Sequence, residues 1–125
     1  MIRQTTAHVD LEALAGNLRS IQHWLQEQRP AAPPEVIAVV KANAYGHGAP
    51  QVARALEAAG ATVLACADIE EGAALRAAGV TADILVFGAL SLSDLDGIFD
   101  CRLTPTISTP GAAVAVDRKS TRLNS

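Results

Sequence analysis

The chain is poor in aromatic residues and has no excess of basic ones. Aromatic side chains make up 3% of its 125 residues, and the formal net charge is −3. Surfaces that bind nucleic acid are basic, so this balance excludes nucleic acid as the main partner. Half of the residues are hydrophobic, and alanine, leucine and valine dominate them. The composition predicts a folded α/β protein packed from small side chains, and it excludes the disordered and fibrous classes.

Cysteines and long apolar runs are also scarce. The two cysteines, Cys66 and Cys101, lie in unrelated segments without ligand-like spacing. This excludes a disulfide framework, favours reduced thiols and leads us to expect no metal site. The N-terminus has no apolar signal-peptide segment, and no run approaches the roughly 20 apolar residues of a membrane helix. The sequence therefore predicts a soluble, cytoplasmic protein that does not interact with membranes.

Lysine is rarer still. Lys41 is the only lysine before Lys119, and it ends an apolar, β-branched run that begins at Val36. A lysine amine beside apolar surface can lose its proton and act as a nucleophile in covalent catalysis. The alternative is a lysine whose stem lies on the surface while its amine reaches water. The residues that follow Lys41 favour the first interpretation.

Helix and strand patterns alternate along the chain. A helix is expected after the cap Asp10, with apolar residues at three- and four-residue steps, and it ends before the proline-rich run 30–34. Later helices are expected to end at Gly60 and Gly79, and a short one to begin near Ser93. Strands are expected at residues 36–40, 62–67, 83–87 and 103–107.

The strand spacing predicts the fold class. Successive strands begin roughly 20 to 27 residues apart, which is the rhythm of βα units in a (β/α)8 TIM-type barrel of about 250 residues. A doubly wound open sheet is the alternative, but no G-x-G-x-x-G follows the first strand. We therefore expect an α/β fold, the first half of a (β/α)8 barrel, truncated after about four strands.

The composition changes abruptly after Val116. Residues 117–125, Asp-Arg-Lys-Ser-Thr-Arg-Leu-Asn-Ser, are polar and basic. They are either a flexible polar tail or the translation of a sequencing adapter, and we favour the adapter. We therefore expect residues 1–116 to be the N-terminal part of a barrel domain that continues beyond Val116, and residues 117–125 to be non-native.

One decapeptide closely resembles the cofactor-lysine signature of the alanine racemases, which interconvert L- and D-alanine with pyridoxal 5'-phosphate. It reads Val39-Val-Lys41-Ala-Asn-Ala-Tyr45-Gly-His-Gly48. Segments at residues 8–14, 67–76, 84–88 and 103–107 resemble other parts of the same family. The resemblance covers residues 7–108, and the decapeptide is its specific part.

The resemblance implies roles for two residues. Lys41 binds the cofactor covalently and, once the substrate amine displaces it, exchanges the α-proton on one face of the substrate. Tyr45 binds the cofactor phosphate; a tyrosine that packs at the barrel rim is the alternative. His47, between two glycines, is expected to be structural.

The resemblance also implies what lies beyond Val116. A second base, which is a tyrosine of the partner subunit in a homodimer, and the arginine that faces the pyridine nitrogen belong there. This chain alone is therefore expected to be inactive. The full-length protein would supply D-alanine for peptidoglycan or catabolise alanine.

Other barrels remain as alternatives. A non-enzymatic barrel that binds pyridoxal phosphate also has a lysine at the end of its first strand, but its following residues usually differ. A related decarboxylase barrel shares Val-Lys-Ala-Asn, whereas Tyr45-Gly-His-Gly48 favours the racemase. A third alternative is a polypeptide with no function of its own.

Overall fold

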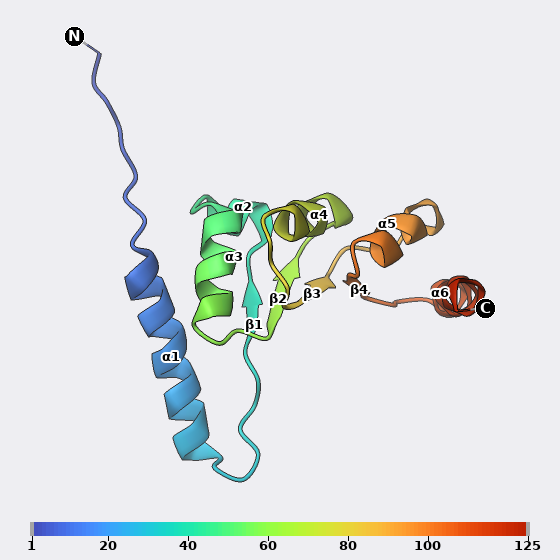
Figure 1. The fold of residues 1–125 in the computed structure, drawn as a ribbon, viewed down its shortest axis with the longest axis horizontal. Coiled ribbons are helices and arrows are strands. Elements are labelled where there is room, and N and C mark those ends of the chain that lie inside the picture. Colours follow the sequence, from blue (N-terminus) through green and yellow to red (C-terminus); the bar gives the residue numbers. More distant parts are fainter. Residues whose placement is uncertain (1, 125) are drawn as a thin grey trace.

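Four short strands alternate with helices along the chain. The computed structural model describes residues 2–124 and, at Leu92, the backbone alone. The elements, in chain order, are α1 (Leu11–Gln28), β1 (Ile37–Val39), α2 (Lys41–Tyr45), α3 (Ala49–Ala58), β2 (Val63–Cys66), α4 (Ile69–Ala77), β3 (Asp83–Val86), the 3-10 turn η1 (Leu92–Asp94), α5 (Leu95–Asp100), β4 (Thr104–Pro105) and α6 (Pro110–Leu123) (Figure 1). Between residues 2 and 124, none of the helices has the length and apolarity needed to cross a bilayer.

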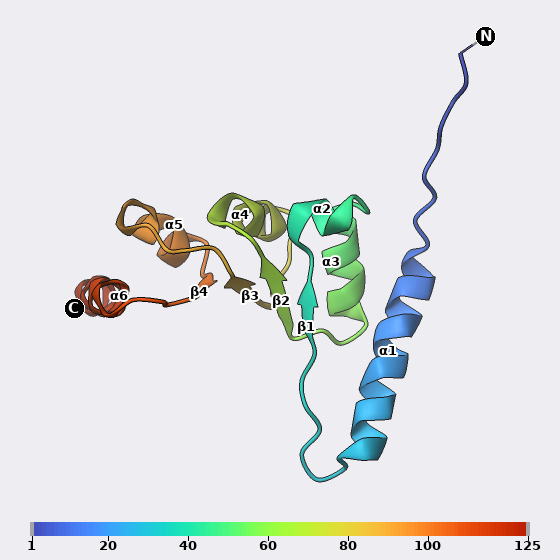
Figure 2. The same ribbon diagram turned by 180° about the vertical axis from the view of Figure 1, so that it is seen from behind.

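The first helix begins and ends where the sequence predicts. The Oδ1 atom of Asp10 accepts a hydrogen bond from the Ala13 N–H at 2.9 Å, and this cap satisfies one of the free N–H groups at the start of α1. Leu18 is buried where α1 packs against α3. The helix ends at its C-cap Arg29, directly before the proline-rich run. In Figure 2, α1 forms one flank of the molecule beside α3.

The strand order identifies the sheet as part of a barrel. β1 pairs with β2, β2 with β3 and β3 with β4, and every pair is parallel. Because crossovers between parallel strands are right-handed, this consecutive order places α3, α4 and α5 on one side of the sheet. They lie side by side in chain order along it (Figure 1). A doubly wound sheet reverses its order and carries helices on both faces. The predicted first half of a (β/α)8 barrel is therefore confirmed.

The face of the sheet toward the helices forms the core. Leu64 and Ile84 are fully buried there, in one apolar cluster with Leu75 of α4. Full burial of each such side chain stabilises the fold by roughly 1.5–3 kcal/mol. Strand residues alternate between faces, and on the opposite face Ile37 and Phe87 are 49% and 46% exposed. That second face corresponds to the interior of a closed barrel.

The C-terminal third differs in detail from the sequence-based expectation. The expected strand at residues 103–107 is reduced to the two-residue β4, where Pro105 has no N–H to donate to a neighbouring strand. The helix α6 was not predicted. Its N-cap is Thr109, whose Oγ1 accepts the Ala112 N–H at 3.1 Å.

Most of the predicted non-native tail continues α6. Residues 117–123 belong to this helix, and Lys119 forms an ion pair with Asp96 of α5. Ser125 lies outside the described residues. The non-native origin of residues 117–125 stays a prediction.

Candidate active site

Lys41 lies directly beyond the carboxyl end of β1, where the sequence places it. Val40 is buried, and its N–H donates to the Ala65 carbonyl oxygen at 2.8 Å. This bond extends the pairing of β1 with β2 up to the residue before Lys41. The Lys41 side chain itself is exposed. Active sites of (β/α)8 barrels lie at this end of the strands, so the amine is placed where a ligand can reach it.

The element labelled α2 is not an ordinary right-handed helix, because the residues that follow Lys41 form a left-handed turn. Ala42, Asn43, Ala44 and Tyr45 all have φ between 52° and 56°. Left-handed helical geometry costs roughly 1–2 kcal/mol per L-residue because Cβ crowds the next carbonyl oxygen. Asparagine tolerates this geometry, so Ala42, Ala44 and Tyr45 together carry about 3–6 kcal/mol. Such strain persists only where surrounding contacts hold it, and it clusters at functional sites. This turn was not predicted from the sequence.

Local hydrogen bonds hold the turn from its C-terminal side. The Ala44 N–H donates to the Val40 carbonyl oxygen at 2.9 Å, and Ala44 is 5% exposed. The Oδ1 atom of Asn43 accepts the Ala49 N–H at 2.9 Å, which joins the turn to the first turn of α3. Gly46 ends the turn with φ of 86°, a value that glycine adopts without steric cost.

A distant carboxylate holds the turn at its N-terminal side. The Oε2 atom of Glu71 accepts the Ala42 N–H at 2.7 Å, and its Oε1 atom accepts the Ala67 N–H at 2.7 Å. The Glu71 N–H in turn donates to the Asp68 carboxylate at 2.8 Å. Asp68 therefore caps α4, while the Glu71 side chain reaches Ala67 and Ala42 instead of returning to the Asp68 N–H as in a complete capping box. No sequence pattern near Glu71 indicates this bridge, because Ala42 lies 29 positions away.

Tyr45 stands on the same turn as Lys41. Its side chain is 59% exposed, and together with His47 it lines a groove of about 440 Å³ between the start of α1 and α3. Lys41 is not among the residues that line this groove. The Nδ1 atom of His47 lies 2.9 Å from the Ala44 carbonyl oxygen and donates to it. The structural role expected for His47 is consistent with this bond.

Cys66 lies near Lys41 in the fold but is not suited to nucleophilic chemistry. It ends β2, beside β1, and is fully buried. Burial raises the pKa of the Cys66 thiol to about 11, and the thiol donates weakly to the Asp68 carbonyl oxygen at 3.4 Å. A neutral thiol is a poor nucleophile, and burial also keeps the Cys66 sulfur away from a ligand, so Cys66 is not a candidate for covalent chemistry.

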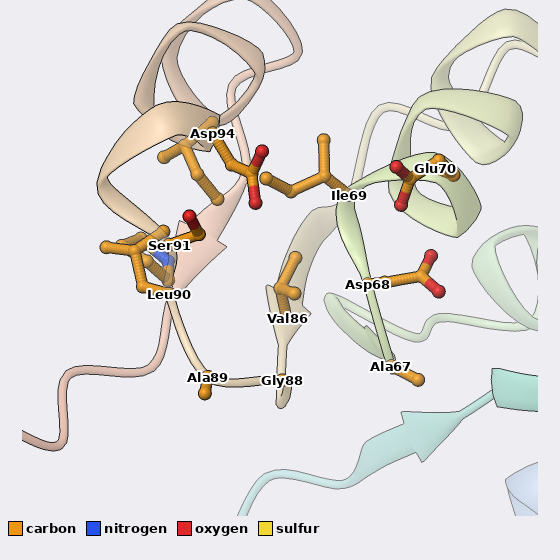
Figure 3. A pocket seen from close by; sticks show the side chains of 12 residues that line it. Ala67, Asp68, Ile69, Glu70, Val86, Gly88, Ala89, Leu90, Ser91 and Asp94 are labelled. Carbon is orange, nitrogen blue, oxygen red and sulfur yellow. The ribbon is translucent and has the colours of Figure 1, made fainter.

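A second, smaller pocket lies at the same end of the sheet, between the start of α4 and the segment that leads into α5. It has a volume of about 70 Å³, and Asp68, Glu70 and Asp94 contribute to its lining. Figure 3 shows these three carboxylates around it. The volume suffices for a few water molecules, and the negative charges disfavour an anionic ligand. This pocket therefore does not suit the phosphate-bearing cofactor that the sequence predicts.

Comparisons with known proteins agree with the fold. The family described as "Alanine racemase, N-terminal domain" matches residues 9–125. Alanine racemase of Carboxydothermus hydrogenoformans is 38% identical over 122 residues, which is 98% of this chain and 32% of the relative. That of Geobacillus stearothermophilus is 46% identical over 92 residues, 74% of this chain and 22% of the relative.

Solved structures give the same result. A structure of alanine racemase of Clostridium difficile in complex with cycloserine superposes with a TM-score of 0.81 and 32% identity, over 91% of this chain and 29% of that one. The alanine racemase of E. faecalis gives a TM-score of 0.76 and 32% identity over 90% of this chain and 29% of that one. The chain spans about a third of the length of the curated relatives it matches. The resemblance to the family is confirmed, and the chain belongs to the alanine racemase family, whose N-terminal domain matches residues 9–125.

Proposed function

We propose that this chain carries the cofactor lysine of an alanine racemase and that Lys41 and Tyr45 bind pyridoxal 5'-phosphate. One observation carries the proposal. Lys41 is exposed at the carboxyl end of the first strand of a half barrel, at the start of a strained left-handed turn that also presents Tyr45. Strain of this size favours a functional explanation for the turn.

The residues present fit this cofactor. Lys41 offers a primary amine for the cofactor aldehyde, and the Tyr45 hydroxyl can donate a hydrogen bond to a phosphate oxygen. A Cβ atom built at Gly46 meets no atom within 4 Å, so the backbone next to Tyr45 leaves room for a ligand. The small pocket beside Asp68 and Glu70 does not fit, because its carboxylates repel a phosphate.

The proposed function gives Lys41 and Tyr45 separate roles. When bound, pyridoxal phosphate supplies an electron sink that stabilises negative charge at the substrate α-carbon. Lys41 would hold the cofactor through its Nζ atom, and the same atom would remove or return the α-proton on one face of the substrate. Tyr45 would hold the phosphate. The hydrogen-bonded turn that carries both residues would set the orientation of the amine, as oriented catalysis requires.

Racemisation also requires a base on the opposite face of the substrate. Tyr45 is the only tyrosine of the chain, and we assign it to the phosphate. We propose that a tyrosine of the partner subunit in a homodimer is the second base, and that an arginine beyond Val116 faces the pyridine nitrogen. The 125-residue chain alone then does not racemise alanine. We place the full activity in the cytoplasm, where it supplies D-alanine for peptidoglycan or serves alanine catabolism.

The alternative is a barrel that binds pyridoxal phosphate without catalysis. Both functions need Lys41, and they differ in the second base. The residues after Lys41 and the names of the relatives favour the racemase. Reading the gene past the codon for Val116 separates them: a following β-domain with a tyrosine supports the racemase, and a chain that ends after one barrel supports the alternative.

The cofactor assignment is tested by trapping. The chain is incubated with pyridoxal phosphate, reduced with borohydride, digested and mapped by mass spectrometry. We expect the cofactor mass on the peptide that contains Lys41, its loss in Lys41→Ala and its retention in the matched variant Lys119→Ala. Cofactor binding that is unchanged in Lys41→Ala contradicts the assignment.

A further inference from the structure

Glu71 joins the ends of two neighbouring strands beside Lys41. One carboxylate oxygen accepts the N–H of Ala42, the residue after Lys41, and the other accepts the N–H of Ala67, the residue after β2. Both distances are 2.7 Å, as expected for bonds to a charged acceptor. Glu71 itself is half-buried on the first turn of α4. A rigid helix thus fixes the two strand ends relative to each other.

The position of the Ala42 N–H makes this bridge specific for Lys41. That N–H belongs to the peptide group that starts at the Lys41 carbonyl carbon. Holding this N–H restricts two backbone angles: ψ of Lys41, before the peptide group, and φ of Ala42, after it. Ala42 is also the first residue with positive φ, at 52°. Glu71 therefore acts at the point where the chain leaves the strand and enters the left-handed turn.

Only a carboxylate satisfies both donors. Each of its oxygens accepts one N–H, whereas a glutamine amide offers one oxygen and directs an NH₂ group at the other donor. The neighbouring Glu70 has an exposed side chain, and between residues 2 and 124 no hydrogen bond or ion pair of that side chain is found. Glu70 has the same charge on the same helix turn and is thus a matched control.

We propose that Glu71 is a positioning residue for Lys41: its carboxylate holds the peptide group after Lys41 so that the lysine amine is presented to the cofactor aldehyde. This inference rests on the proposed function of Lys41. In the step concerned, the amine nitrogen adds to the aldehyde carbon, a carbon–nitrogen double bond forms and water leaves. Borohydride then delivers hydride to that carbon, the nitrogen takes a proton from water, and the link becomes permanent.

The test compares labelling of Lys41 in four forms of the 125-residue chain: unchanged, Glu71→Gln, Glu71→Asp and Glu70→Gln. Each form is mixed with Nα-acetyllysine and limiting pyridoxal phosphate, reduced, digested and quantified by mass spectrometry. We expect Lys41 of the unchanged chain to be labelled in preference to Nα-acetyllysine. Glu71→Gln should lower this preference roughly tenfold, the effect of losing one charge-assisted hydrogen bond. Glu70→Gln should leave it unchanged, and labelling of Lys119 should be the same in all forms.

The outcomes separate the two proposals. Lys41 labelled no more than Nα-acetyllysine in the unchanged chain contradicts the proposed function itself. Preferred labelling that is equally strong in Glu71→Gln, with an unchanged urea midpoint, overturns the role of Glu71 and leaves the proposed function standing. If Glu71→Gln does not fold, Glu71→Asp decides: it keeps the charge but is one methylene too short to reach both amides. Full preference in folded Glu71→Asp overturns the inference, and a reduced one supports it.

Discussion

We expect Ala42→Gly to stabilise the chain because Ala42 lies in the left-handed turn, whereas the same substitution in a right-handed helix destabilises. Ala42 is exposed and has φ of 52°, so Ala42→Gly removes steric strain and sacrifices little burial. Relief of left-handed geometry contributes roughly 1–2 kcal/mol, and the greater freedom of glycine in the unfolded chain offsets about 0.5–1 kcal/mol of it. The expected result is a gain of about 0.5–1 kcal/mol in the free energy of unfolding.

Urea unfolding followed by circular dichroism measures this gain. With a slope of about 1–3 kcal/mol per molar urea, the midpoint should rise by roughly 0.2–1 M. The matched control is Ala74→Gly, because Ala74 is also exposed but lies inside the right-handed helix α4. There the same substitution should destabilise by about 0.5–1 kcal/mol. Equal destabilisation by both substitutions would refute the left-handed turn at Ala42.

Three further predictions concern other parts of the fold. Hydrogen bonds to Glu57, that from the Thr81 hydroxyl first, hold its pKa below the ordinary 4.5. The stabilisation that these hydrogen bonds give is therefore complete above pH 4.5, and it is lost as the pH falls through the lower pKa that Glu57 has in the folded chain. Glu57→Gln should lower the urea midpoint at neutral pH, and the midpoint of this variant should fall less steeply in acid. Gly88→Ala should destabilise by about 1–3 kcal/mol in the same assay, because a Cβ at this position would clash with the Ala67 carbonyl oxygen. An unchanged urea midpoint contradicts this close approach. Iodoacetamide near pH 8 should alkylate half-buried Cys101 before Cys66, whose pKa burial raises to about 11; faster labelling of Cys66 by peptide mapping contradicts its burial.

The parts of the fold that local chemistry determines were predictable. Asp10 and Asp68 each indicate the start of a helix because an aspartate carboxylate can cap a free N–H group, and both caps are observed. The glycines at positions 60 and 79 have positive φ at helix ends, as expected. The apolar runs became strands because helices cover one face of them.

The parts that distant contacts determine were not predictable. Asn43 tolerates left-handed geometry, but the alanines on either side of it prefer the right-handed helix, so Lys-Ala-Asn-Ala-Tyr does not predict the turn. Glu71, which accepts the Ala42 N–H, lies 29 positions beyond it. α6 is a different case, because Thr109 followed by Pro110 is a recognisable helix start that the contrast in composition after Val116 obscured.

The bridge from Glu71 has a consequence for protein engineering. Transplanting the decapeptide around Lys41 into another barrel would transfer the amine but not its orientation, because the carboxylate that holds Ala42 belongs to the next βα unit. A graft that includes the strand end at Ala67 together with the first turn of α4 carries the missing support. The portable unit of the proposed cofactor site is therefore a pair of adjacent βα units and not a sequence motif.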